Sequence, residues 1–286
     1  MNCFVIIKKV LDHLWQNIPG NDEEKTKLVT LTSGHLRKQY LSYPKRDPID
    51  YSTPHVQFAY LYMYTAAHAD YLFQVLKLSR STHNLPRENS FHLVSLGGGP
   101  GSDLLGFLKY FDLATDVDEL NFKYSSFDKD GNWSFRWSAL TDFIQTECHN
   151  AGICSRYSAA FHTLDVCNMS AISEMGQFLD ADAYTLMYFF SEIASVKKTA
   201  YPFLREFFTK IQPGATLIFI DINYSDVYND FDGLMRETGF KVLHAEGRTI
   251  TPSMDEQSST LAEYKQVVGM SPKLKGDIAC RVMQKT

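Results

Sequence analysis

A run of glycines between an apolar segment and a helix-like segment is the feature that most restricts how this chain can fold. Residues 91–96 are largely apolar and predict a short buried strand, and residues 103–110 predict a helix. Between them lie Gly97, Gly99 and Gly101. Glycine is needed where a loop adopts dihedral angles that other residues avoid, and where the backbone must approach a ligand. The segment therefore predicts a strand, a tight ligand-binding loop and a helix, as in open α/β sheets.

The chain after residue 90 continues this alternation of strands and helices. Strands are expected over residues 91–96, 122–127, 157–164, 183–190, 215–220, 240–245 and 278–283. Helices are expected between them, over residues 103–110, 133–148, 194–211 and 226–238. The pattern predicts an α/β fold, a Rossmann-like, seven-stranded and mostly parallel sheet with helices on both faces. The polar connection 247–276 is long for a structureless loop, so we expect it to be mobile or functional.

The first 90 residues show no convincing strand and are expected to form an N-terminal helical extension. Helices are expected over residues 5–15, 24–40 and 53–78. The last of these carries Tyr60, Tyr64 and His68 on one face, since residues four apart lie on the same side of a helix. This aromatic face either packs against the next domain or forms a lid over a ligand. We expect a helical lid or substrate region, residues 1–88, and an α/β domain, residues 89–286.

Composition adds weaker limits. The net charge of −5 weighs against a dedicated nucleic-acid binder, which usually has a basic face. Five cysteines at irregular spacing indicate free thiols of a reduced compartment. Cys148, His149, Cys154 and His162 lie close in sequence, but no C-x2-C pair is present and we expect no metal site. Without a membrane-length apolar run or a secretory signal, we expect no membrane partner and a cytoplasmic or nuclear location.

Carboxylates follow several predicted strands, at the edge of the sheet where ligands bind in open α/β folds. Asp128 follows the second strand, where a carboxylate can accept hydrogen bonds from both hydroxyls of a ribose. Asp165 follows the third strand and Asp221 the fifth. Glu192 follows the fourth strand, where it either takes a proton from a substrate or caps the next helix. The sequence therefore predicts a ligand site lined by acidic groups.

A dinucleotide-binding loop is the rival interpretation of the glycines. That fingerprint, G-x-G-x-x-G, would place glycine or alanine at position 102, which is Ser102 here. The G-x-G-x-G register of Gly97, Gly99 and Gly101 is instead the form seen in enzymes that use S-adenosyl-L-methionine. On this motif and the strand order, residues 91–286 resemble the class I S-adenosyl-L-methionine-dependent methyltransferase superfamily, in which the last strand inserts antiparallel.

The resemblance implies a cofactor, S-adenosyl-L-methionine, and a set of site residues. Those implied to bind the cofactor are Gly97, Gly99, Gly101, Asp103, Asp128, Asp165, Val166 and Ser191. Asp165 would receive the adenine amino group, and Val166 would pack on the adenine ring. Glu192 and Asp221 would be catalytic. Tyr60, Tyr64 and His68 would contact the substrate.

Two stretches, Val94–Gly101 and Leu186–Tyr224, are further similar to the fungal 25S ribosomal RNA uridine-N3 methyltransferases. The similarity implies an RNA acceptor, whose uridine N3 proton Glu192 or Asp221 would remove. Ser191 stands where that family has asparagine. An RNA substrate would be matched by surface lysine and arginine pairs, such as Lys8 with Lys9, Lys45 with Arg46, and Lys273 with Lys275. A small-molecule or protein acceptor, and a catalytically silent cofactor-binding module, are the alternatives.

Overall fold

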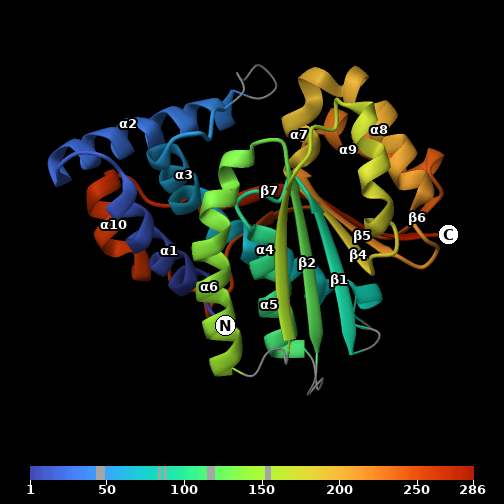
Figure 1. The fold of residues 1–286 in the computed structure, drawn as a ribbon, viewed down its shortest axis with the longest axis horizontal. Helices are drawn as coiled ribbons and strands as arrows, with labels where there is room; N and C mark the ends of the chain where they lie inside the picture. The colour runs from blue at the N-terminus through green and yellow to red at the C-terminus, as the bar shows by residue number, and fades with distance from the viewer. Residues whose placement is uncertain (43–48, 83–84, 87–88, 115–119, 152–155) are drawn as a thin grey trace.

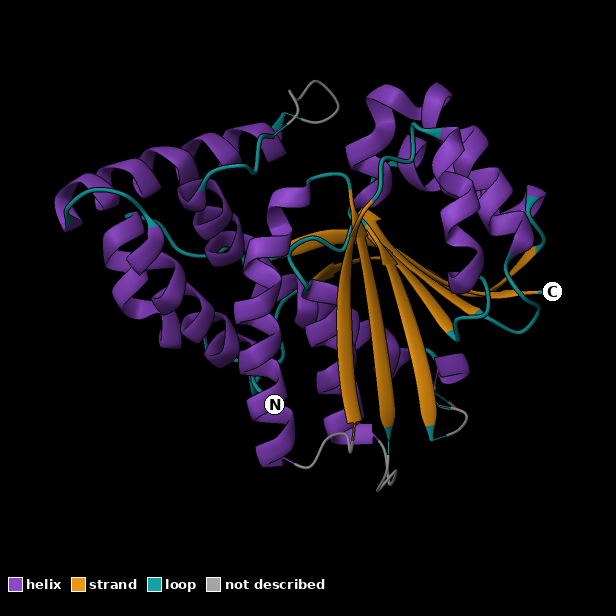
Figure 2. Ribbon diagram, in the orientation of Figure 1, coloured by secondary structure: helices purple, strands orange, loops and turns teal. Residues whose placement is uncertain are grey.

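A seven-stranded sheet forms the centre of the protein (Figures 1 and 2). The computed structural model describes residues 1–42, 49–82, 85–86, 89–114, 120–151 and 156–286. The strands are β1 (Ser90–Leu96), β2 (Asn121–Asp128), β3 (Arg156–Thr163), β4 (Ala183–Met187), β5 (Thr216–Ile222), β6 (Phe240–Ile250) and β7 (Gly276–Lys285). Their order is β3-β2-β1-β4-β5-β7-β6, and only β7 runs antiparallel to its neighbours. The predicted sheet, with an inserted antiparallel last strand, is confirmed.

Helices cover both faces of this sheet. One buried cluster joins the first face to α1 (Cys3–Asn17), α2 (Asp22–Leu41), α3 (Pro54–Tyr60), α4 (Ala66–Leu78), α5 (Ser102–Ala114), α6 (Ser134–Ala151) and α10 (Ala262–Val268). A second cluster joins the other face to α7 (Phe189–Ile193), α8 (Lys197–Lys210) and α9 (Ser225–Glu237). Short 3₁₀ segments are η2 (Arg80–Thr82), η3 (Gly131–Trp133), η4 (Met169–Phe178), η5 (Ala194–Val196) and η6 (Ser258–Leu261). The segment η1 (Leu61–Thr65) is a π-helix.

The central strands explain why two helical layers are needed. Successive side chains of a strand point to opposite faces. In β1, Leu93 belongs to the first cluster, whereas Val94 and Leu96 belong to the second. All five residues of β4 are buried. Such strands are apolar on both faces, so both faces must be covered.

The fourth strand is shorter than its apolar run suggests. The run predicts strand over residues 183–190, but β4 ends at Met187 and Phe189–Ile193 is a short helix. Tyr188 has φ 55° and ψ 24°, a left-handed conformation that turns the chain. The Asp221 carboxylate accepts a hydrogen bond from the Ser191 amide at 3.0 Å and so holds the turned segment. A contact from another strand therefore overrides the local strand preference.

The connection 247–276 is also more ordered than a loop. Strand β6 continues to Ile250, and η6 and α10 follow. Leu261, Tyr264 and Val268 are buried and recur at helical spacing. In Figure 1 the red helix α10 lies among the blue N-terminal helices. The connection thus completes the N-terminal helical layer, and the division of the chain at residue 88 stays a prediction.

The expected helix 53–78 contains an irregular turn. It consists of α3, the π-helix η1 and α4 in succession. A π-turn adds one residue to a turn of the helix and is often found at functional sites. The ring of Tyr64, within this turn, lies 5.2 Å from that of Tyr60, the last residue of α3.

A buried ion cluster connects the two ends of the chain to α5. Lys109 Nζ lies 2.8 Å from Asp70 Oδ1, 2.8 Å from Asp255 Oδ2 and 2.9 Å from Glu256 Oε1. Glu256 also accepts the amide hydrogen of Cys3 at 2.9 Å, at the start of α1. The side chains of Lys109, Asp70 and Glu256 are fully buried. Three carboxylates and one ammonium therefore hold α1, α4, α5 and the segment before η6 together.

Removing the ammonium should be strongly destabilising. Lys109→Ala leaves two buried carboxylates without their cation, so we expect the free energy of unfolding to fall by about 3–5 kcal/mol. Urea denaturation followed by circular dichroism measures this. Lys265→Ala, at an exposed position of α10, is the control and should change it by less than about 0.5 kcal/mol. Equal effects of the two substitutions would contradict the structural role given to Lys109.

Candidate active site

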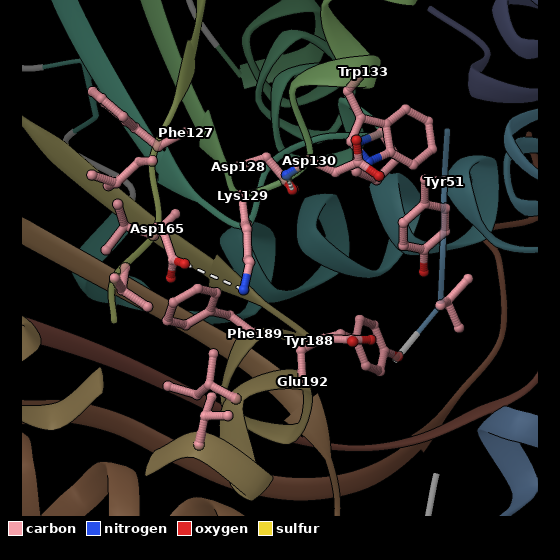
Figure 3. Close-up of a pocket in the computed structure, with 18 of the residues that line it drawn as sticks. Tyr51, Phe127, Asp128, Lys129, Asp130, Trp133, Asp165, Tyr188, Phe189 and Glu192 are labelled. Atoms are coloured by element: carbon pink, nitrogen blue, oxygen red, sulfur yellow. Dashed lines mark hydrogen bonds and ion pairs between the residues drawn. The ribbon is translucent and has the colours of Figure 1, made fainter. Parts of the chain in front are cut away.

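A cavity of about 630 Å³ opens at the carboxyl ends of β1, β2, β3 and β4 (Figure 3). The residues that follow these four strands line it, together with residues 49–51 and Tyr60 from the N-terminal helical part. Parallel strands all end at the same edge of a sheet, which is why the segments from four strands meet here. The cavity is large enough for a nucleoside-sized ligand.

The glycine loop forms the floor of the cavity. Gly97 has φ +76° and donates its amide hydrogen to the Phe127 carbonyl at 2.7 Å. A Cβ at Gly99 would lie 2.5 Å from Trp133 Cδ1 and 2.6 Å from Asp128 Oδ2. Glycine is required at Gly97 by its backbone conformation and at Gly99 by the lack of space. Gly97 lines the cavity, whereas Gly99 and Gly101 support the loop from behind.

Backbone amides of the glycine loop and of the loop after β2 hold Asp128 in place. Its Oδ2 accepts the Gly99 amide hydrogen at 3.0 Å and its Oδ1 accepts that of Asp130 at 2.9 Å. Burial raises the pKa of Asp128 to about 6 even though these two amides favour the ionised form. The carboxylate lines the cavity, as predicted for a group that binds a ribose.

Asp165 and Val166 line the next part of the wall. Asp165 Oδ2 lies 3.2 Å from Lys129 Nζ, and Oδ1 accepts the Cys167 amide hydrogen at 2.9 Å. Partial burial opposes ionisation, but the Cys167 amide and the Lys129 ammonium hold the pKa of Asp165 below its ordinary value. Asp165 is therefore an ionised acceptor at neutral pH.

Aromatic side chains from distant parts of the chain form one wall of the cavity. The Trp133 ring lies 5.2 Å from that of Tyr51 and 5.9 Å from that of Tyr60. Tyr51 and Tyr60 meet edge to face at 5.4 Å. Trp137, which also follows Asp128 in sequence, packs on Tyr124 instead and does not line the cavity. Of the two tryptophans, only Trp133 is thus placed to contact a ligand.

Glu192 and Ser191 lie at the mouth of the cavity, after β4. Ser191 is buried and donates its amide hydrogen to Asp221, whereas Glu192 is exposed. The Tyr40 hydroxyl donates to Glu192 Oε1 at 3.4 Å and lies 3.1 Å from the Tyr51 hydroxyl. Helix α2 thereby contacts the segment after β4 across the opening.

Four of the other predicted site residues do not line the cavity. Asp221 is fully buried beneath α7, where its oxygens accept the amide hydrogens of Ser191 and Ile222. Asp103 is buried behind the glycine loop, and Tyr64 packs between Tyr40 and Tyr60. His68 stacks on Tyr188, a cavity residue, with ring centroids 4.1 Å apart. Their predicted roles in binding or catalysis stay predictions.

Several lining residues were not predicted from the sequence. Lys129 and Asp130 directly follow Asp128, and their place in the same loop after β2 is a signal that would have indicated them. Tyr40, which contacts the lining residue Glu192 without lining the cavity itself, gives no such signal, because it lies on a helix far away in sequence and reaches Glu192 only through the tertiary fold.

Most of the charged side chains that line the cavity are negative. Among the described residues that line the cavity, the carboxylates are Asp50, Asp128, Asp130, Asp165 and Glu192, and the only cation is Lys129. Excess carboxylates favour a ligand that carries positive charge and oppose one that carries phosphates.

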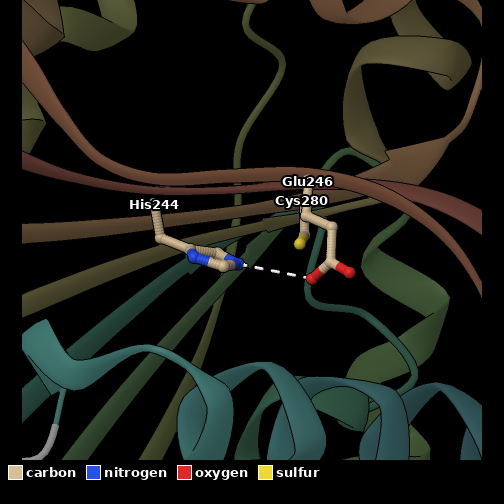
Figure 4. A group of neighbouring side chains, drawn as sticks. All are labelled: His244, Glu246 and Cys280. Atoms are coloured by element: carbon tan, nitrogen blue, oxygen red, sulfur yellow. Dashed lines mark ion pairs between the residues drawn. The ribbon is translucent and has the colours of Figure 1, made fainter.

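A separate group of polar side chains lies on the β6–β7 pair (Figure 4). His244 Nε2 lies 3.5 Å from Glu246 Oε2, and Cys280 is the third member. Arg248 also approaches Glu246, at 3.7 Å, and burial raises the pKa of Cys280 to about 11. The nearby guanidinium and the protonated thiol fit an ordinary polar contact on a sheet. Of the four residues considered for zinc, the side chains of Cys148 and His149, and all of Cys154, lie outside the described residues, and His162 stacks on Phe127.

None of the described helices combines the length and the apolar character needed to cross a bilayer.

The pair Lys45 and Arg46, named above for RNA binding, lies outside the described residues.

Comparison with known proteins gives similarities of fold. No family model and no curated protein matches the chain. A solved structure of CurJ carbon methyltransferase is 14% identical, covers 93% of this chain and 68% of its own, and has a TM-score of 0.46. A Pyrococcus horikoshii protein assigned as an RNA methyltransferase is 12% identical, with coverages of 87% and 97% and a TM-score of 0.43. Precorrin-6y C5,15-methyltransferase from Geobacter metallireducens is 7% identical, with coverages of 74% and 89% and a TM-score of 0.40. None of these TM-scores reaches 0.5, so the similarities do not establish a family or a function.

Buried carboxyl groups at this end of the sheet should make stability depend on pH. Burial raises the pKa of Asp103, Asp128 and Asp221 to about 6 each. A carboxyl whose folded pKa exceeds its unfolded value binds more protons when folded, so its contribution to stability is present at low pH and is lost as pH rises through about 6. Asp103→Asn should therefore reduce the fall in unfolding free energy between pH 5 and pH 8 by about 1–2 kcal/mol.

Urea titrations at the two pH values measure this difference. Asp142→Asn, at an exposed position of α6, is the control and should follow the parent protein. An unchanged pH dependence in Asp103→Asn would show that Asp103 is ionised in the folded protein down to its ordinary pKa.

Proposed function

We propose that the protein is an S-adenosyl-L-methionine-dependent methyltransferase whose cofactor occupies the cavity at the ends of β1 to β4. The observation that carries the proposal is the coupling of the glycine loop to Asp128. The Gly99 amide donates to the carboxylate, and the space beside Gly99 is too small for a Cβ. The loop and the carboxylate are thus built as one unit on the cavity floor, which suits a nucleoside ligand.

The remaining lining fits the same cofactor. Asp128 is placed to accept hydrogen bonds from the ribose hydroxyls, and Asp165 with Val166 to contact the adenine. The excess of carboxylates suits the positive sulfur of the cofactor. When bound, S-adenosyl-L-methionine supplies a methyl group activated by its positive sulfur: a lone pair of the acceptor forms the new bond to the methyl carbon, and the electrons of the broken carbon–sulfur bond stay on the sulfur.

The chain's own part in the reaction is to orient the acceptor, exclude water and remove a proton. Tyr51, Tyr60 and Trp133 form an apolar wall of the cavity and would limit the water beside a bound ligand. For Glu192 we propose the role of proton acceptor, since it stands at the mouth with its carboxylate beside the Tyr40 hydroxyl. For Asp221 we propose a positioning role, because both of its oxygens are used to hold the backbone that carries Ser191 and Glu192.

A small-molecule acceptor is favoured over RNA by the charge of the lining. The resemblance to the uridine-N3 methyltransferases supports RNA as the acceptor. Against it, five carboxylates and a single lysine line the described cavity, and phosphates bind where Lys and Arg gather. We therefore propose a small-molecule acceptor, with an RNA uridine as the second candidate.

Cofactor binding can be tested through matched glycine substitutions. Gly99→Ala forces a methyl group against Trp133 and Asp128, so we expect the affinity for S-adenosylhomocysteine to fall at least tenfold by calorimetric titration. Gly233→Ala is the control, because a Cβ there meets no atom within 4 Å, and it should bind like the parent. Failure of the parent protein to bind either S-adenosyl-L-methionine or S-adenosylhomocysteine would overturn the proposed cofactor.

The acceptor class can be tested with a radiolabelled methyl group. Incubation of the protein and labelled S-adenosyl-L-methionine with separate RNA, protein and metabolite fractions should label the metabolite fraction. Label in RNA would favour the uridine proposal instead. Cofactor binding without label in any fraction would favour a catalytically silent module.

Glu192→Gln separates proton transfer from cofactor binding. The substitution keeps the size and hydrogen-bonding capacity of the side chain but removes its basicity. We expect turnover of the labelled fraction to fall by about 10²–10⁴-fold, with S-adenosylhomocysteine affinity within about threefold of the parent. A folded variant with normal turnover would exclude Glu192 as the proton acceptor.

A further inference from the structure

Two buried polar atoms beside the cavity have no hydrogen-bond partner among the described residues. They are the Tyr188 hydroxyl oxygen and His68 Nε2. The residues are only 7% and 5% exposed, and their rings stack at 4.1 Å with an interplanar angle of 23°. Buried polar groups in folded proteins nearly always have a partner, because an unmet one costs about 1–3 kcal/mol. A ligand at this position would supply the missing acceptor and remove that cost.

The backbone at Tyr188 supports a functional reading. Among the described residues, Tyr188 alone combines a side chain with a positive φ. Such a conformation is costly for a residue with a Cβ, and it persists where the surrounding structure requires it, often at binding sites. Here it ends β4 and places Tyr188 where it both lines the cavity and stacks on His68.

A half-buried ammonium lies beside Tyr64 and acts electrostatically on His68. Lys273 belongs to the connection before β7, and its amide donates to the Met63 carbonyl at 2.9 Å, within the π-helix. Its Nζ lies 5.9 Å from the centre of the Tyr64 ring, and it forms no ion pair with any carboxylate in the described part of the chain. Burial lowers the pKa of Lys273, and the ammonium adds to the larger effect of burial in lowering the pKa of His68.

Asp221 does not accept a hydrogen bond from the Tyr188 hydroxyl or from His68 Nε2. Asp221 acts electrostatically on Tyr188, but its Oδ2 accepts the Ser191 amide hydrogen and its Oδ1 that of Ile222. The group of Tyr188, His68 and Lys273 is therefore rich in donors, whereas the cavity lining that Tyr188 shares is rich in carboxylates.

We propose that Tyr188, His68 and Lys273 form the subsite for an anionic oxygen of the methyl acceptor, and that this acceptor is an aromatic carboxylate. The proposal rests on the function proposed above. The ammonium and the Tyr188 hydroxyl bind the carboxylate, and the rings of Tyr60 and Tyr188, which line the cavity, provide surfaces for an aromatic ring. The π-helix and the connection 247–276 both serve the subsite: the first positions the tyrosines, and the second delivers Lys273.

Benzoate and benzamide are matched probes of this subsite, since they share size and shape but differ in charge. Calorimetric titration into protein saturated with S-adenosylhomocysteine should show benzoate binding at least tenfold more tightly than benzamide. Lys273→Met should remove that preference, and Lys275→Met, at an exposed position of the same segment, should keep it. Equal binding of the probes, no binding of benzoate, or a preference that survives Lys273→Met would each overturn the proposal.

A second variant covers the case in which Lys273→Met does not fold. Tyr188→Phe removes only the hydroxyl, so the melting temperature should hold or rise while benzoate affinity falls at least threefold. Tyr228→Phe, on α9, is the control and should leave benzoate affinity unchanged. A lower melting temperature with unchanged benzoate affinity would assign the Tyr188 hydroxyl a structural role and overturn its part in the subsite.

The same titrations distinguish this proposal from the proposed cofactor. If the protein does not bind S-adenosylhomocysteine but retains the benzoate preference and its loss in Lys273→Met, the anion subsite stands and the methyltransferase proposal fails. If S-adenosylhomocysteine binds and the preference is missing, the methyltransferase proposal stands and the aromatic carboxylate is wrong.

Discussion

The buried contact of Lys109 with Asp70, Asp255 and Glu256 is the interaction on which the rest of the structure depends. It brings the first helix, the helix before the sheet and the segment after β6 onto α5, the helix that follows the glycine loop. Charges removed from water are costly unless they are paired and fully hydrogen-bonded, so the cluster admits one arrangement of these four segments. That arrangement puts the tyrosines of the N-terminal helices over one end of the sheet.

The cavity that results from this arrangement has two halves, one supplied by the sheet and one by the helical layer. The sheet supplies the glycine loop, Asp128 and Asp165, which stand at the ends of neighbouring parallel strands. The N-terminal helical part supplies Tyr51 and Tyr60, which pack against Trp133 in the cavity wall. A carboxylate-rich lining with the half-buried Lys273 behind the helical half is a division of charge that suits the proposed cationic cofactor and anionic acceptor.

Sequence patterns predicted most of the sheet because its strands are apolar and its turns carry glycine or aspartate. They placed the end of β4 wrongly, since the run from Ala183 to Phe190 is apolar throughout and the left-handed turn at Tyr188 is stabilised by Asp221, from another strand. They also missed α10, although Leu261, Tyr264 and Val268 recur at helical spacing, because the polar residues between them resemble a loop. Among the site residues, Asp128, Asp165 and Glu192 were predicted to be at strand ends and do line the cavity.

The sequence by itself determined the α/β architecture, the position of the glycine loop and the acids that follow the strands, because these depend on local periodicity and on neighbours along the chain. Only the tertiary structure decided that Tyr40 meets Glu192, that Asp221 is used to hold a turn, and that Lys273 lies near His68. Those contacts join residues separated by tens to hundreds of positions. They are fixed by burial and by the pairing of charges in the folded core, which no local pattern records.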